Sequence, residues 1–254
     1  MKNIIITDDA SGNAELALKM GVRIAEKSEG EIELIHLKYG NDDEEYSDKL
    51  DRYLEKVRHE SISKIRKTIS SLSGAIEMIN RQGDSSILIL PYDIDKRRSS
   101  SIFSKPIEKI LDNVNIPILF ISDEFSIQEV RTIAIIEDLT DAQMHKTFED
   151  WGGTFFENAE VHFVFHKQNI YQDDGVILDK MKEVSSEYNL IPTQIHIMDH
   201  SDLKTLITNL DERFNLDVLV LKNYKKDILR KLFEGNEYRE LIKEKKFNVI
   251  TEKV

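Results

Sequence analysis

The chain has 254 residues, of which 47 are acidic and 35 are basic, so its formal net charge is −12. This excess argues against a general nucleic-acid or anionic-membrane surface, because such surfaces need clustered Lys and Arg. Cysteine is absent, which excludes disulfides, thiolate metal sites and a thiol nucleophile. No apolar run approaches the ~18 residues of a membrane-spanning helix, and the apolar stretch near the N-terminus is too short for a signal peptide. We therefore expect a soluble, cytoplasmic protein.

Short runs rich in Ile, Leu and Val alternate with amphipathic stretches through the first half of the chain. Continuous apolarity is typical of strands buried on both faces of a sheet. The strands that it predicts are Asn3–Asp8, Glu31–Leu37, 87–90 and 118–122. Apolar residues at helical spacing predict a first helix from Ala14, a long second helix over 48–72 and a third over 106–113.

The segment 75–80 fits this series poorly. It is apolar enough for a strand, yet the strand at 87–90 follows only six residues later. Parallel strands need a crossover of about a dozen residues or more. Either the two segments form a hairpin, or 75–80 is not a sheet strand at all. We favour the loss of one helix from the first half.

The long helix over 48–72 is longer than the strands it would cover. At about 1.5 Å per residue it spans roughly 38 Å, whereas a six-residue strand spans about 20 Å. The helix must overhang the sheet or break near 61–63. Its overhanging apolar stripe suggests homodimerisation.

The same order of elements restarts in the second half, so we expect an internal repeat split near 123–129. The predicted strands are 130–137, 161–165, 193–198, 218–221 and 247–251. The predicted helices are 141–151, 176–188, Leu203–Phe214 and one within 225–245. Strands that alternate with helices indicate parallel sheets built from βαβ units. We expect an α/β protein with two domains, 1–126 and 127–254.

Asp9, Ala10 and Ser11 follow the first apolar run, and Ala17 and Leu18 lie within the next helical pattern. This segment resembles the first strand, Asp-Gly-Ser turn and first helix of the universal stress protein family. In that comparison Asp9 stands at the Asp, Ala10 at the Gly and Ser11 at the Ser of the turn.

Two further segments carry the resemblance over nearly the whole chain. The stretch from Ile107 to Ile121, which contains Pro117, resembles the family's last helix and last strand, and Asp138 takes the place of Asp9 in the second half. The resemblance implies two tandem Rossmann-like domains, each an open and mainly parallel sheet flanked by helices. The first domain is expected to be reduced by about one helix. Some members of the family bind ATP and others do not.

ATP-binding members carry a Gly-x2-Gly-x9-Gly-Ser/Thr segment after the fourth strand, because phosphate must approach backbone N–H groups at a helix N-terminus. Aligned on Pro117, the first half has other residues at all four positions: Pro91, Ile94, Ser104 and Lys105. The second half retains one glycine, and its residues there are Lys222, Lys225, Gly235 and Asn236. These lysines are either solvated surface residues or phosphate contacts by charge. The nucleotide-site residues that the resemblance implies are Asp9, Ser11, Asp138, Lys222, Lys225, Gly235 and Asn236.

Histidines and carboxylates suggest a second kind of site. His162 and His166 share one face of a strand, and His196 lies on the expected neighbouring strand. Imidazole and carboxylate together can hold Zn²⁺ or a similar ion. The alternative is a set of surface or partly buried histidines bonded to their neighbours, or a pH-sensitive patch. The residues expected at this edge are Asp138, His166, Asp199 and His200.

We therefore expect a non-enzymatic stress-response regulator or binding protein that has lost the usual ATP-binding glycines. The alternative is an ATP-binding protein, with slow ATPase activity, that uses the second domain. No catalytic residue and no resident cofactor are expected in the first case, and ATP is the cofactor in the second. The expected partners are other proteins or a second copy, with neither nucleic acid nor membrane. Within one chain, the strand from Ile116 to Ser122 is expected to pair with the strand from Phe247 to Thr251 as a pseudo-dimer.

Overall fold

The computed structural model describes residues 3–8, 14–37, 51–52, 54–55, 64–83, 85–91, 105–121, 130–138, 159–167, 175, 178–179, 182, 193–199, 202–222 and 248–252. The chain divides into two compact units, Met1–Ile127 and Gln128–Val254. Each unit is an α/β structure with five described parallel strands, which confirms the predicted fold class. None of the helices in the described ranges is long and apolar enough to cross a membrane.

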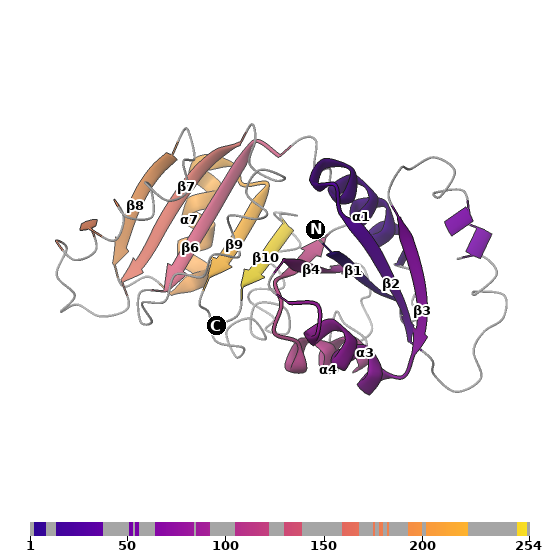
Figure 1. Ribbon diagram of the computed structural model, residues 1–254. Helices are drawn as coiled ribbons and strands as arrows, with labels where there is room; N and C mark the ends of the chain where they lie inside the picture. The colour runs from indigo at the N-terminus through magenta and orange to yellow at the C-terminus, as the bar shows by residue number, and fades with distance from the viewer. Residues whose placement is uncertain are drawn as a thin grey trace, which may run out of the picture. The chain divides into compact units, whose positions relative to one another are not determined.

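The first unit contains a sheet of order β3-β2-β1-β4-β5. Its strands are β1 (Asn3–Asp8), β2 (Glu31–Leu37), β3 (Ile65–Ser70), β4 (Ser86–Pro91) and β5 (Ile118–Ile121). Its helices are α1 (Ala14–Ser28), α3 (Leu72–Asn80) and α4 (Lys105–Asn113). Figure 1 shows α1 on one face of this sheet and α3 with α4 on the other. That placement follows from right-handed crossovers, because the connection from β1 to β2 crosses the sheet in one direction and the connections from β3 to β4 and from β4 to β5 cross it in the other.

The core of the first unit lies on both faces of β1. Ile4, Ile5 and Ile6 are consecutive and all fully buried, as expected for a strand covered by helices on both sides. Helix α1 approaches this strand closely at Gly21, where a Cβ would stand only 2.8 Å from Cδ1 of Ile6. On the other face, the Asn80 side chain links α3 to the end of α4. It donates to the Asn113 carbonyl at 2.9 Å and accepts from the Asn115 N–H at 2.9 Å.

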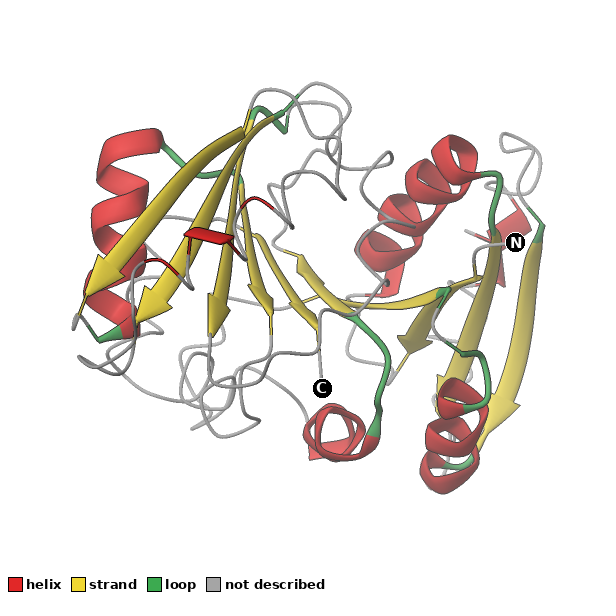
Figure 2. Ribbon diagram, turned by 60° about the vertical axis from the view of Figure 1, so that its left-hand side comes forward, coloured by secondary structure: helices red, strands yellow, loops and turns green. Residues whose placement is uncertain are grey.

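The second unit contains a sheet of the corresponding order, β10-β9-β6-β7-β8. Its strands are β6 (Thr132–Asp138), β7 (Glu160–Lys167), β8 (Thr193–Asp199), β9 (Val218–Lys222) and β10 (Asn248–Glu252). Helix α7 (Leu203–Phe214) lies against one face of this sheet (Figure 2). It buries Leu203, Leu206, Ile207 and Leu210 on that side.

Most predicted elements are confirmed, several of them at the same residues. Strands β1 and β2 and helix α7 have the predicted bounds, and β4, β5, β6, β7, β8, β9, β10 and α4 differ from them by a few residues at most. The predicted helix over 141–151 and the predicted helix within 225–245 lie outside the described residues, as does most of the predicted helix over 176–188.

The prediction of one helix over 48–72 is wrong, because β3 occupies Ile65–Ser70. The side chains of Ile65 and Ile69 satisfy a helical and a strand pattern equally, since a spacing of four residues returns to the same face in both. Residues 51–52 and 54–55 are helical, which agrees with the alternative that the helix breaks before β3. A helix that ends before β3 does not run on to residue 72, so the argument for homodimerisation through an overhanging apolar stripe is lost.

The segment 75–80 belongs to helix α3, so the strand interpretation of it is also wrong. Of the two alternatives, the second holds: the segment is not a sheet strand. Helix α3 supplies the crossover between β3 and β4. The first unit is therefore not reduced by a helix. The expected loss came from interpreting residues of α3 as a strand.

Candidate functional site

Each unit has one point where the connections from two neighbouring strands run toward opposite edges of the sheet, and we call it the chain-reversal point. In the first unit it lies between β1 and β4, and in the second between β6 and β9. Open α/β sheets bind ligands beyond the carboxyl ends of the strands at such a point. The strand ends there are Asp8 and Pro91 in the first unit and Asp138 and Lys222 in the second.

The first unit offers a strand end poorly suited to phosphate. Pro91 is the last residue of β4, in register with Ile121 of β5. Proline has no N–H to donate. Lys105 begins helix α4. The other predicted residues of this site, Asp9, Ser11, Ile94 and Ser104, lie outside the described residues.

In the second unit the structure brings two predicted residues to one strand edge. Asp138 is the last residue of β6 and Lys222 the last residue of β9, and these strands are neighbours with Glu137 in register with Lys222. An acidic and a basic residue thus end the two neighbouring strands at the chain-reversal point. Lys225, Gly235 and Asn236 lie outside the described residues.

The predicted metal residues are placed less favourably. His166 pairs in register with Asp138 on one side and with Met198 on the other, whereas Asp199 pairs with Lys167. His166 and Asp199 thus hold register positions of opposite parity along adjacent strands. His200 is not among the described residues. Over the described ranges, no group of three or more His, Cys, Asp or Glu side chains could hold a metal ion.

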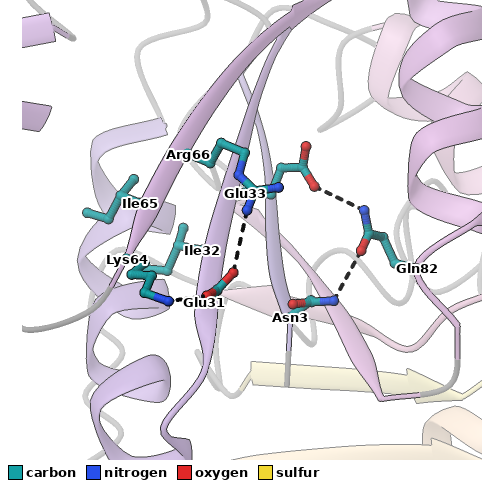
Figure 3. Close-up of a pocket in the computed structure, with 8 residues that line it drawn as sticks. All are labelled: Asn3, Glu31, Ile32, Glu33, Lys64, Ile65, Arg66 and Gln82. Atoms are coloured by element: carbon teal, nitrogen blue, oxygen red, sulfur yellow. Dashed lines mark hydrogen bonds and ion pairs between the residues drawn. The ribbon is translucent and has the colours of Figure 1, made fainter. Parts of the chain in front are cut away.

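A pocket of about 510 Å³ lies at the opposite, N-terminal edge of the first unit's sheet (Figure 3). The starts of three strands and the turn after α3 form its wall. Its lining residues are Asn3, Glu31, Ile32, Glu33, Lys64, Ile65, Arg66 and Gln82. The sequence carries no local signal for this pocket, because its polar residues come from segments as distant as 3 and 82 and form no motif.

The charged groups of this pocket pair with each other. Lys64 Nζ and Arg66 lie 3.0 and 3.6 Å from the two Glu31 oxygens. Gln82 Nε2 donates to Glu33 at 3.0 Å and Gln82 Oε1 accepts from Asn3 at 3.1 Å. Such internally satisfied groups tie the strand starts together, and a ligand would have to displace them.

The second unit also contains a pair of histidines in direct contact. His162 Nδ1 lies 3.2 Å from His196 Nε2. The register sets His162 opposite Gln194 and His196 opposite Val164, so the rings are diagonal neighbours on β7 and β8. Phe214 stacks on His162 with ring centroids 3.8 Å apart. The sequence indicated that the two histidines lie on adjacent strands, but it did not indicate Phe214, which ends a helix elsewhere in the chain.

Comparisons with known proteins bear on the fold. No family model matches the sequence, and no curated protein matches it significantly. A candidate universal stress protein from Pseudomonas aeruginosa superposes with a TM-score of 0.65 at 17% identity, covering 100% of this chain and 93% of that one. A universal stress protein from Archaeoglobus fulgidus gives 0.66 at 14% identity, covering 99% and 96%.

A third solved structure is the cytoplasmic domain of a prokaryotic cation chloride cotransporter. It superposes with a TM-score of 0.61 at 13% identity, covering 98% of this chain and 94% of that domain. At these identities the likeness establishes the architecture and not the activity. Over its whole length, the chain has the fold of solved universal stress proteins.

Proposed function

We propose that this chain is a non-enzymatic stress-response regulator or binding protein that recognises partners and does not turn over nucleotide. The observation that carries the proposal is Pro91, the last residue of β4 at the chain-reversal point of the first unit. Phosphate at this position is held by backbone N–H groups. A proline has no N–H, so this position lacks one of the donors that would hold the phosphate.

Mass spectrometry of gently denatured protein, together with thermal shift in millimolar Mg-ATP, tests this proposal. We expect no adenine nucleotide to be released and no rise in melting temperature. A ligand at 100 times its Kd stabilises by about 2.7 kcal/mol, which is easily detected. Stoichiometric nucleotide on the purified chain would contradict the proposal.

A second candidate function is ATP binding by the second unit. Asp138 and Lys222 support it, because they end adjacent strands at the chain-reversal point. On this alternative Lys222→Ala and Asp138→Asn abolish any stabilisation by Mg-ATP. Lys167→Ala is the matched control, since Lys167 ends β7, away from that point. Equal responses in all three variants would remove the alternative.

We also propose that the strand from Ile116 to Ser122 and the strand from Phe247 to Thr251 pair with each other. Strands β5 and β10 each end the strand order of their own unit, and an uncovered edge invites pairing. Hydrogen exchange tests this pairing. Amides of both strands should exchange as slowly as those of the central strands β1 and β6, and fast exchange of either strand would count against the pairing.

A further inference from the structure

Three rings join two strands and a helix in the second unit. His162 of β7 is 0% exposed, and its Nδ1 lies 3.2 Å from Nε2 of His196 on β8. Phe214, the last residue of α7, stacks on His162 and lies 5.2 Å from the His196 ring, measured between centroids. Any change in the bond between the imidazoles therefore acts on β7, β8 and α7 together.

The bond between two imidazoles holds one proton. The Nε2 atom of His162 is buried without a hydrogen-bond partner and lies 3.7 Å from Oε1 of Glu160. We infer that His162 carries its proton on Nε2, toward this carboxylate, and that His196 Nε2–H donates to His162 Nδ1. The opposite tautomer would turn a lone pair toward Glu160.

The bond survives one added proton and not two. A single protonated ring can still donate to a lone pair on the other. When both rings are protonated, N–H groups face each other across the same 3.2 Å gap and two positive charges meet in a buried site. Breaking this contact is then favourable.

The charged groups around the pair set when this happens. Burial lowers the pKa of His162; Glu160 on β7 raises it, and His196 on β8 and Arg213 on α7 lower it. Burial and Arg213 lower the pKa of His196. Arg213 is held near the pair, since its guanidinium lies 5.1 Å from the centre of the Phe214 ring. Both imidazoles therefore remain neutral at a pH where exposed histidines are charged.

We propose that the bonded His162–His196 pair is a pH-operated lock, closed while at most one ring is protonated and opened when both rings are protonated, which releases β8 and the end of α7. A histidine in the unfolded or opened chain protonates near pH 6.5. The closed form binds these protons only at a lower pH than the opened chain does. The stability of the closed form is therefore complete above about pH 6.5 and falls as the pH drops below this value.

Opening has a structural consequence beyond the pair. Strand β8 is hydrogen-bonded to β7, which pairs with β6 on its other side. Loss of β8 uncovers the backbone N–H and C=O groups of β7, and such an edge is available to another strand. The lock therefore couples acidification to the exposure of a sheet edge.

Native-state hydrogen exchange at pH 7.5 and pH 5.5 tests this, with rates corrected for the intrinsic effect of pH. We expect protection in β7, β8 and the end of α7 to fall by up to about tenfold for each histidine that stays neutral in the closed form, because an opened histidine protonates near pH 6.5, one unit above the lower pH. Strands β1 and β4 of the first unit serve as a reference in the same molecule and should change little. Equal changes in both units would overturn the proposal.

Two variants separate the lock from general acid sensitivity. His162→Phe retains a ring against Phe214 and removes the titrating bond, and His196→Gln retains a donor to His162 and removes one charge. Each variant should abolish most of the pH response of β8. If one variant fails to fold, the other still tests the proposal. The control is His36→Gln in β2, which should leave that response intact. An unchanged response in the folded His162 or His196 variant would refute the lock.

Discussion

Single carboxylates hold several strand and helix ends of this chain. Asp217, just before β9, accepts the backbone N–H groups of Arg131 and Thr132 at 2.7 and 2.9 Å. Asp211 of α7 accepts the N–H of Leu216 at 3.1 Å in a buried position. Donors at element ends have no ladder or helix partner, and a charged acceptor satisfies them strongly.

Replacing Asp217 by Ala should destabilise the second unit by about 1–3 kcal/mol, because two N–H groups at the start of β6 lose their acceptor. Asp217→Asn keeps one oxygen and should cost less. Urea unfolding followed by circular dichroism measures the difference. Asp179→Ala is the control, since that side chain is 80% exposed and pairs only with Lys182 among the contacts described. Equal effects of Asp217→Ala and Asp179→Ala would show that the strand link contributes little.

Replacing Glu160 by Gln should enlarge the acid sensitivity of the second unit. Glu160 raises the pKa of His162, so its loss lowers that pKa further and widens the gap to the unfolded chain. Because Glu160 is partly exposed and screened, we expect the added loss between pH 7.5 and pH 5.5 to stay below about 1.4 kcal/mol, the equivalent of one pKa unit. Urea midpoints at both pH values measure it. Glu212→Gln, on the exposed side of α7, should not change the pH dependence.

At the scale of elements, periodicity located strands better than it separated strands from helices. The uninterrupted apolar run of β1 admits one interpretation, because both faces of that strand are buried. The edge strand β3 is only partly buried, and Ile69 is 62% exposed, so its pattern is weak. The start of α3 did carry a local signal: Ser71 is its N-cap and accepts the Gly74 N–H at 3.3 Å.

The cap of α7 gives a prediction at this scale. Asp202 accepts the Thr205 hydroxyl at 2.7 Å and its N–H at 3.1 Å, and these bonds lower the pKa of Asp202. Asp202→Ala should cost about 1 kcal/mol at pH 7. A lowered pKa contributes stability above about pH 4 that disappears as pH falls through the folded value. Asp202→Asn should keep most of the cap and lose this pH dependence, which denaturant titrations at pH 7 and pH 3 measure.

At the scale of the molecule, the fold was more predictable than its sites. Strand ends are readable from sequence to within about a residue: the strands predicted to end at 137 and 221 end at Asp138 and Lys222. Register is not readable in that way, and it separates His166 from Asp199. The contact of Phe214 with His162 depends on how α7 packs on the sheet, which no spacing within one segment encodes.

Each of the two units has its own buried core, so damage to one core should remain local. Ile5 of β1 and Ile135 of β6 are both 0% exposed in the centre of their own sheets. Ile5→Ala and Ile135→Ala should each cost about 2–5 kcal/mol, through lost burial and the cavity left behind. Hydrogen exchange should show the loss of protection in the first unit for Ile5→Ala and in the second for Ile135→Ala. The two variants are matched controls for each other, because residue type and burial are the same. If either substitution lowered protection equally in both units, the cores would form one cooperative structure, and an acid-driven opening confined to β8 would be harder to sustain.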